Sequence, residues 1–434
     1  MNHDMRKLNF FLLSVLFFTL TFSSCKKRDD DKTDSEKTAI ENNLGNSEVT
    51  SEKVTVIFNT DGATGAVEPQ TVEKGTKITL PLGEGMKKDG YKFLGWSLTE
   101  NGEIITEYTV NENEVTLFAV WEQVIFTVKF DTDGGSGEFA SQTIEKGKTV
   151  TKPESKPEKE NYVFMGWYDG DTKFDFSTAI TTDVDLKAKY AVLLPGVFSV
   201  SPTKKVRFSG GNLQYHCKNG TWRFADNQYD CIGIYNDFIS ASYDGYIDLF
   251  GFGAWLEGQD PLQIDYDYRQ YDVETDGKNF IGTSAIGEGW ETLSMDEWDY
   301  LIKRSDKKIG VAKVGVHGGF VILPDEWTLP NDVTFNSGFV EDYRHQSFGD
   351  VNDYTIEEWN KMESAGAVLL PAGRYRYVDA NGFRMGGNGS GYWSATVYNP
   401  ERAFRFGFYV ERANLISAPR YHGQSVRLVR VVQD

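Results

Sequence analysis

Two copies of one module lie in tandem in this sequence, and an internal repeat of this kind constrains the fold before any single motif does. Three pairs of segments match at a spacing of 71 or 72 residues. Within each copy, alternating apolar residues broken by Asp-Gly and Lys-Gly turns predict short strands, because glycine supplies the positive φ that tight turns need. The matching pairs are 56–62 (VIFNTDG) with 128–134 (VKFDTDG), 70–75 (QTVEKG) with 142–147 (QTIEKG), and 90–96 (GYKFLGW) with 161–167 (NYVFMGW).

This pattern of a strand, Thr-Asp-Gly, Gln-Thr-[Val/Ile]-Glu-Lys-Gly and a closing aromatic resembles the Listeria-Bacteroides repeat, also called the internalin B-repeat. The match covers residues 54–190. The resemblance implies a compact β-grasp (ubiquitin-like) shape for residues 52–122 and 123–192. It also implies a spacer, sometimes a protein-binding unit, of a surface protein. We expect Trp96 and Trp167 to pack in the small aromatic cores of the two copies.

The first 25 residues have the layout of a secretory signal. Two basic residues precede an apolar run at 10–22, and Ser23-Ser24-Cys25 follows. This run is too short to span a bilayer comfortably. The segment is similar to the lipobox of bacterial lipoproteins, with Phe22 where that motif usually has leucine. The resemblance implies lipidation of Cys25 and a membrane as partner. A cleaved soluble signal and an uncleaved membrane helix are the alternatives.

Residues 26–51 contain few apolar side chains, and this composition predicts a disordered tether. Three basic residues follow Cys25, and Asp29-Asp30-Asp31 come next. The acidic run is similar to the signal that sends lipoproteins of Bacteroides-type bacteria to the outer face of the outer membrane. The resemblance implies an outer-membrane lipoprotein exposed at the cell surface. A solvated charged linker is the alternative, and the choice between the inner and outer faces stays open.

From residue 194 to residue 434 the repeat period is absent and the sequence is more varied. Two capping boxes, Ser294 with Glu297 and Thr355 with Glu358, predict two helices, and Gly366 is placed to end the second. The remaining apolar segments predict strands, so a mainly β chain with an α+β head is expected. The expected strands are 206–209, 212–215, 222–224, 368–370, 374–378, 392–396, 403–410 and 425–432.

The order of the motifs LQY, WRFA, LSMDEW, GYWSAT and SVRLVR in this segment resembles the Fibrobacter major paralogous domain. That family is similar to the C-type-lectin-like fold that formylglycine-generating enzymes and variable receptor-binding proteins share. The resemblance therefore implies a C-type-lectin-like head. A fold by itself does not determine function.

We expect no catalytic site, no metal site and no cofactor. The histidines lack the spacing of a zinc site, and no cysteine follows Cys231, whereas formylglycine-type oxidases use a cysteine pair near the C-terminus. A net charge of −19 disfavours binding of nucleic acid. Cys217 and Cys231 form either a disulfide or two free thiols, because an exported chain permits both.

The segment 264–271 (IDYDYRQY), which follows Trp255, is the recognition candidate of this sequence. Aromatic rings stack on sugar C–H groups while carboxylates bind hydroxyls, and the same side chains suit protein surfaces. Packing of the tyrosines onto their own domain is the alternative. The candidate ligand-binding residues are Trp255, Asp265, Tyr266, Asp267, Tyr268 and Tyr271.

Together these features predict a lipid-anchored cell-envelope protein that presents a non-catalytic binding or adhesion head on a repeat stalk. The expected ligand is a glycan or a protein. A structural or assembly component of an envelope complex is the second hypothesis, and an enzyme with an unrecognised site is the third.

Overall fold

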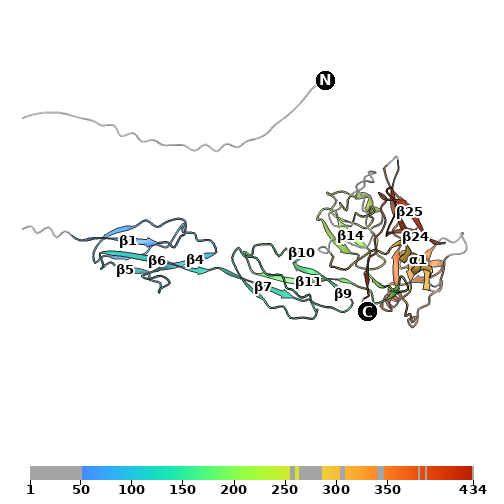
Figure 1. Cartoon of the computed structure of the whole chain (residues 1–434), viewed down its shortest axis with the longest axis horizontal. Coiled ribbons are helices and arrows are strands. Elements are labelled where there is room, and N and C mark those ends of the chain that lie inside the picture. Colours follow the sequence, from blue (N-terminus) through green and yellow to red (C-terminus); the bar gives the residue numbers. More distant parts are fainter. Residues whose placement is uncertain are drawn as a thin grey trace, which may run out of the picture.

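The computed structural model of the chain is mainly β and elongated. It describes residues 51–254, 260–262, 286–303, 308–339, 347–379, 382–386 and 389–432. The two repeats lie one after the other along the long axis, and the larger C-terminal part, which we call the head, lies at one end (Figure 1). In the described part, none of the helices is both long and apolar enough to cross a membrane.

Repeat 1 is built around two parallel strands, β1 (Lys53–Asn59) and β6 (Glu114–Gln123). The antiparallel strands β2 (Gln70–Glu73) and β4 (Tyr91–Ser97) complete a sheet of order β2-β1-β6-β4. Alternate side chains of β1 are buried, as expected for a strand with one face on a core. A second small sheet pairs β3 (Lys77–Thr79) with β5 (Glu107–Thr109).

Repeat 2 repeats this arrangement, with β7 (Ile125–Asp131) parallel to β11 (Val184–Val192) at its centre. Its sheet has the order β10-β9-β11-β7-β8. The strand β9 (Tyr162–Asp169) lies beside β11, and β8 (Gln142–Glu145) and β10 (Thr172–Lys173) are the edge strands.

The two expected tryptophans occupy equivalent places in the cores of the repeats. Trp96 is 1% exposed and Trp167 is 3% exposed. Phe93 meets Trp96 edge-on at 5.4 Å between ring centroids, and Phe164 meets Trp167 edge-on at 5.5 Å. The expectation that both tryptophans are core residues is therefore confirmed.

The head contains small sheets and two helices, and both capping boxes are present. Ser294 accepts from the Glu297 N–H at 3.2 Å and opens α1 (Met295–Lys303). Thr355 opens α2 (Ile356–Ser364), and Gly366 follows it at φ +101°. The sheets have the orders β12-β13-β26, β15-β14-β16, β19-β17-β18-β20, β21-β22 and β23-β24-β25.

The strands of the head are short. In chain order they are β12 (Phe198–Ser199), β13 (Lys205–Phe208), β14 (Leu213–His216), β15 (Thr221–Phe224), β16 (Tyr246–Ile247), β17 (Ile309–Val314), β18 (His317–Ile322), β19 (Asp353–Tyr354), β20 (Val368–Pro371), β21 (Tyr375–Asp379), β22 (Gly382–Gly386), β23 (Ser390–Asn399), β24 (Arg402–Phe408), β25 (Ala413–Pro419) and β26 (Val429–Val431). The described part of the head also includes the 3-10 helices η1 (Gly233–Phe238) and η4 (Phe348–Asp350).

The expected final strand at 425–432 is wrong in extent, because only β26 is regular strand there. The residues before it bond to different partners in turn. The Val426 carbonyl accepts from the Leu213 N–H at 2.9 Å, and the Leu428 carbonyl accepts from the Ser209 N–H at 2.9 Å. The segment crosses the head core with Val426 and Leu428 fully buried, so its apolar pattern alone does not distinguish it from a strand.

Candidate functional site

Repeat 2 packs directly on the head and shares its hydrophobic core. Val163 and Ala191 of repeat 2 are each 4% exposed and lie in one cluster with Leu213 and Phe224 of the head. Of the two backbone hydrogen bonds at the junction, the first closes the end of repeat 2, as a Val124–Gly90 bond does in repeat 1, and the second crosses to the head. The Leu193 N–H donates to the Asn161 carbonyl at 2.9 Å, and the Gly210 N–H donates to the Val192 carbonyl at 2.8 Å.

The equivalent positions of repeat 1 carry charged residues. Val163 and Ala191 are cross-strand partners in repeat 2, and Lys92 and Glu122 are cross-strand partners at the same place in repeat 1. Lys92 and Glu122 are exposed. The repeats therefore differ where repeat 2 meets the head: an exposed pair of charged residues in repeat 1 corresponds to a buried apolar pair in repeat 2.

Further contacts hold the junction. Arg207 of the head donates from Nε to the Leu194 carbonyl at 2.7 Å and from Nη2 to the Asn161 side chain at 2.6 Å. Gly287, at φ +90°, lies so close to repeat 2 that a Cβ there would come within 2.6 Å of the Phe164 carbonyl oxygen. These contacts leave two hollows beside the junction, each lined by both repeat 2 and the head.

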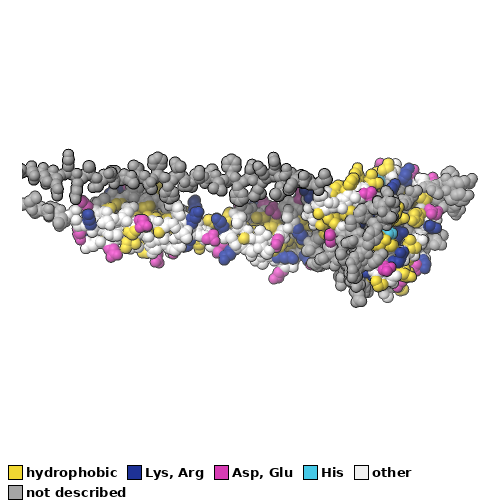
Figure 2. Space-filling model, turned by 90° about the horizontal axis from the view of Figure 1, so that it is seen from above, with side chains coloured by type: hydrophobic (Ala, Val, Ile, Leu, Met, Phe, Trp, Pro, Cys, Tyr) yellow, Lys and Arg dark blue, Asp and Glu magenta, His cyan; other side chains and the backbone are white. Residues whose placement is uncertain are grey.

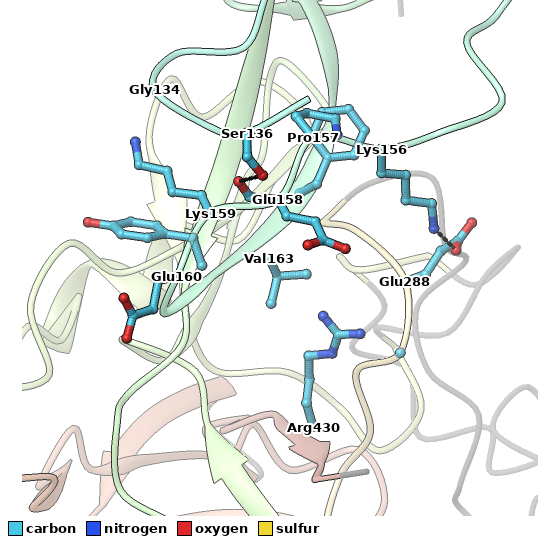
Figure 3. Close-up of a pocket in the computed structure, with 13 residues that line it drawn as sticks. Gly134, Ser136, Lys156, Pro157, Glu158, Lys159, Glu160, Val163, Glu288 and Arg430 are labelled. Carbon is cyan, nitrogen blue, oxygen red and sulfur yellow. Dashed lines mark hydrogen bonds and ion pairs between the residues drawn. The ribbon is translucent and has the colours of Figure 1, made fainter. Parts of the chain in front are cut away.

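The first hollow, which we call the Arg430 groove, is open and has a volume of about 1050 Å³. Lys156 of repeat 2 forms an ion pair with Glu288 at its edge (Figure 3). Arg430 points into the groove from the head, toward Val163 and Glu158 (Figure 3). Burial lowers the pKa of Arg430 from its usual value. The lining mixes both charges, so the groove has no single electrostatic preference.

The second hollow, which we call the Trp222 cleft, has a volume of about 960 Å³. One wall comes from β9, β10 and β11 of repeat 2, and the other comes from the β14–β15 hairpin and Tyr246 of the head. The hairpin turns at Gly220, whose φ of +69° suits glycine. Gly210 also lines the cleft, and its backbone lies close to β11. A Cβ on Gly210 would lie 2.6 Å from the Cβ of Val192.

A separate aromatic surface lies on η1. Ile234, Tyr235 and Phe238 are each between 55% and 59% exposed, and the Phe238 ring lies 5.6 Å from that of Tyr243. We call these residues the η1 patch. Large apolar side chains that cluster on a surface mark interaction sites more often than single ones do.

On the face drawn in Figure 2, charged side chains of both signs are spread along the repeats.

A buried polar network holds η1 in place. Asn236 donates from Nδ2 to the Asp248 carboxylate at 2.8 Å and accepts from the Asp248 and Leu249 N–H groups at 3.0 Å each. The Ile232 N–H donates to the other Asp248 oxygen at 2.9 Å. Burial raises the pKa of Asp248 to about 6. The exposed side chains of η1 therefore project from a backbone that is fixed by satisfied buried groups.

Both head cysteines are free thiols in the structure, and no disulfide joins them. Cys217 is buried and Cys231 is partly buried. Burial raises the pKa of both thiols, that of Cys231 to about 12, so both stay protonated at neutral pH. Of the two alternatives for the pair, the structure contains the free thiols.

The other predicted site residues lie outside the described part of the chain. These are Cys25 and the recognition candidates Trp255, Asp265, Tyr266, Asp267, Tyr268 and Tyr271. Their roles stay predictions. Across the described ranges, no three His, Cys, Asp or Glu side chains lie close enough together to hold a metal ion.

Sequence reasoning did not find the two hollows or the η1 patch. Trp222 is recognised in the sequence only as a strand residue, and the residues of the Trp222 cleft come from several separate segments between positions 165 and 246, so no motif marks them. The run GIYNDF at 233–238 is the one local signal, because three large apolar side chains lie within five residues.

Comparison with known families identifies the class of the two repeats. Residues 55–120 and 126–189 match the Listeria-Bacteroides repeat domain. The chain therefore contains two Listeria-Bacteroides repeats, as its sequence predicts.

Individual proteins are similar over the same part of the chain. A protein of Evansella cellulosilytica whose name assigns it to the membrane is 36% identical over 146 residues, covering 32% of this chain and 21% of its own. Internalin H of Listeria monocytogenes is 30% identical over 133 residues, covering 29% of this chain and 23% of its own. The match thus spans about a fifth of the length of these curated relatives.

A solved structure of streptococcal SHIRT domains 3–4 from a cell surface protein is also similar. It is 17% identical and has a TM-score of 0.18, covering 32% of this chain and 97% of the solved chain. A likeness at that TM-score carries no argument about fold or function.

Proposed function

We propose that this chain is a lipid-anchored protein of the bacterial outer membrane, exposed at the cell surface, which presents a non-catalytic binding head on a stalk of two β-grasp repeats. The head is proposed to have a C-type-lectin-like fold. The observation that carries the proposal is the order of parts along the molecule: the first described residues lie at the end of repeat 1 away from the head (Figure 1). An anchor on Cys25 would then place both repeats between the membrane and the head.

Three features support presentation rather than catalysis. The thiols of Cys217 and Cys231 are held protonated by burial. The η1 patch and the Trp222 cleft offer contact surfaces for a ligand. The relatives that match the repeats include a protein named for the membrane and an internalin, which agrees with a location at the cell envelope.

Replacement of Cys25 by serine tests the anchor. Mass spectrometry of the mature wild-type chain is expected to find an N-terminal cysteine that carries a diacylated thiol and an acylated amine. The Cys25→Ser chain is expected to leave the membrane fraction, because serine lacks the thiol that would carry the lipid. An unmodified N-terminus together with an unchanged membrane fraction in the variant contradicts lipid anchoring.

A structural or assembly role in an envelope complex is the second proposal. The net charge of −19 and the exposed η1 patch are compatible with docking into a larger assembly. Absence of any ligand in binding screens, together with co-purification of the same envelope proteins under stringent washing, is the result that favours this second role.

A further inference from the structure

We propose that repeat 2 is half of the ligand site and that the Trp222 cleft binds a neutral oligosaccharide between repeat 2 and the head. The inference rests on the proposed binding function and makes it specific. Repeat 2 is then a part of the recognition unit, whereas repeat 1 serves only as a spacer.

The two walls of the Trp222 cleft are held in a fixed relation before any ligand arrives. Val163 and Ala191 are buried in the head core, the Val192 carbonyl accepts from the Gly210 N–H, and Arg207 donates to the Asn161 side chain. A preformed site avoids the free-energy cost of ordering its walls on binding. The exchange of an exposed Lys92–Glu122 pair for a buried Val163–Ala191 pair shows that this docking is a property of repeat 2 alone.

Two cations that line the cleft already have partners, and the Asp226 carboxylate adds a negative charge to its lining. Lys189 of repeat 2 lies 2.8 Å from the Asp171 carboxylate and 4.9 Å from the centre of the Tyr168 ring. Arg223 of the head stacks at 3.7 Å over Tyr246, and its Nε donates to Gln214 at 2.9 Å. An anionic ligand would have to displace these partners, so the site favours an uncharged one.

Polar side chains with unused hydrogen-bonding capacity surround an aromatic ring in this cleft. The Trp222 ring packs against Tyr215 at 4.8 Å and Phe250 at 5.3 Å between centroids, and its indole N–H has no acceptor among the described residues. Four further side chains line the cleft without a side-chain hydrogen bond to any part of the chain that the structure describes. These are Thr172 of repeat 2 and Asn219, Thr221 and Asp226 of the head.

Hydroxyl, amide and carboxylate groups next to an aromatic ring match the chemistry of a sugar, whose hydroxyls bond to polar groups while its C–H face stacks on the ring. A peptide is less well matched. The edge strands beside the cleft, β10 and β15, have two and four residues, which limits the backbone pairing that an added peptide strand uses.

The test is a screen of the full mature chain against arrays of neutral glycans, acidic glycans and peptides, followed by calorimetric titration with the neutral glycan that binds most tightly. Thr172→Ala removes a group from the repeat 2 wall, and Asn219→Ala removes one from the head wall. Each is expected to weaken binding about five- to tenfold, as loss of one hydrogen bond does. Both residues are exposed, so both variants are expected to keep the wild-type melting temperature.

Glu160→Ala is the matched control, because Glu160 is an exposed residue that lines the Arg430 groove instead. It is expected to leave the affinity unchanged. Trp222→Leu is expected to abolish stacking, and its melting temperature must be measured alongside because the ring also contacts Phe250.

Three results overturn the inference. If neither Thr172→Ala nor Asn219→Ala affects glycan binding, the Trp222 cleft is not the binding site, although the proposed binding function still holds. Binding of peptides that is lost in these two variants refutes the oligosaccharide assignment. Failure to bind any glycan or peptide contradicts the inference and the proposed binding function together.

Discussion

Val163→Lys is expected to lower the free energy of unfolding of the repeat 2–head unit by about 3 kcal/mol or more, because it places an ammonium group in an apolar core without a partner. Val163 is 4% exposed and packs with Ala191 and Phe224. The substitution introduces the residue that repeat 1 has at the same place, Lys92. Urea unfolding of the mature chain, followed by tryptophan fluorescence, measures the loss.

The matched control is Lys92→Val in repeat 1. Lys92 is exposed, so the reverse exchange is expected to change stability by no more than about 0.5 kcal/mol. Equal and small effects of Val163→Lys and Lys92→Val would show that repeat 2 does not depend on the head. A large effect confined to Val163→Lys would establish that the two repeats have different roles although they share one fold.

The Val163→Lys variant also tests whether loss of the packing between repeat 2 and the head weakens ligand binding. If the walls of the Trp222 cleft separate when Val163 is replaced, glycan affinity is expected to fall although no cleft residue that contacts the ligand has changed. Val163→Ala is the milder companion. It leaves a cavity without a charge and is expected to cost about 1 to 3 kcal/mol, with a correspondingly smaller loss of affinity.

Asp248→Ala is expected to destabilise the head by about 2 to 4 kcal/mol and to release η1. The substitution leaves the Ile232 N–H without its acceptor and removes one of the two acceptors of Asn236 Nδ2, which also donates to the Gly233 carbonyl, and an unsatisfied buried donor is costly. Hydrogen exchange is expected to show faster exchange at 232–238 in the variant. Unchanged protection of these amides would refute the role given to this network.

Asp248 also predicts a dependence of stability on pH. Its pKa is raised by burial from 3.8 to about 6 in the folded chain. A raised carboxyl pKa means that folding favours the protonated form, so the contribution of Asp248 is complete below about pH 3.8 and is lost as the pH rises through about 6. The contribution is of the order of 3 kcal/mol.

The measurement is the free energy of unfolding of wild type minus that of Asp248→Asn, taken between pH 4 and pH 8. The difference is expected to grow in favour of wild type as the pH falls from 7 to 4. Exposed paired carboxylates such as Asp133, whose pKa is lowered by Lys187, make the free energy of unfolding rise with pH, which is the opposite direction. They are present in both proteins and cancel in the difference. A difference that is flat over this range contradicts the raised pKa.

Local sequence signals predicted the elements whose stability is local. The capping boxes at Ser294 and Thr355 mark helix starts correctly, because a cap is formed by side chains within one turn. The turns of the repeats and the burial of Trp96 and Trp167 were predicted for the same reason, since an alternating pattern and its turn glycines lie within one short segment.

The sequence pattern did not predict the structure correctly where one segment forms backbone hydrogen bonds with several different strands. The hairpin of β17 and β18 and the strand β25 were not expected, and residues 425–428 were expected to be strand. The buried run 425–428 bonds in turn to β23, β14 and the end of β13, so its apolar character reflects its place in the core and not a regular ladder.

By itself, the sequence determined the two repeats, their strand pattern, their aromatic cores and the two helices of the head, because each depends on spacing within a few tens of residues. Only the tertiary structure decided that repeat 2 shares a hydrophobic core with the head, whereas repeat 1 has a core of its own. The difference between Lys92 with Glu122 and Val163 with Ala191 is visible in the sequence, but its meaning depends on what covers each pair. Burial is set by neighbours that are distant along the chain, and Leu213, Phe224 and Val426 of the head are the residues that make Val163 a core residue.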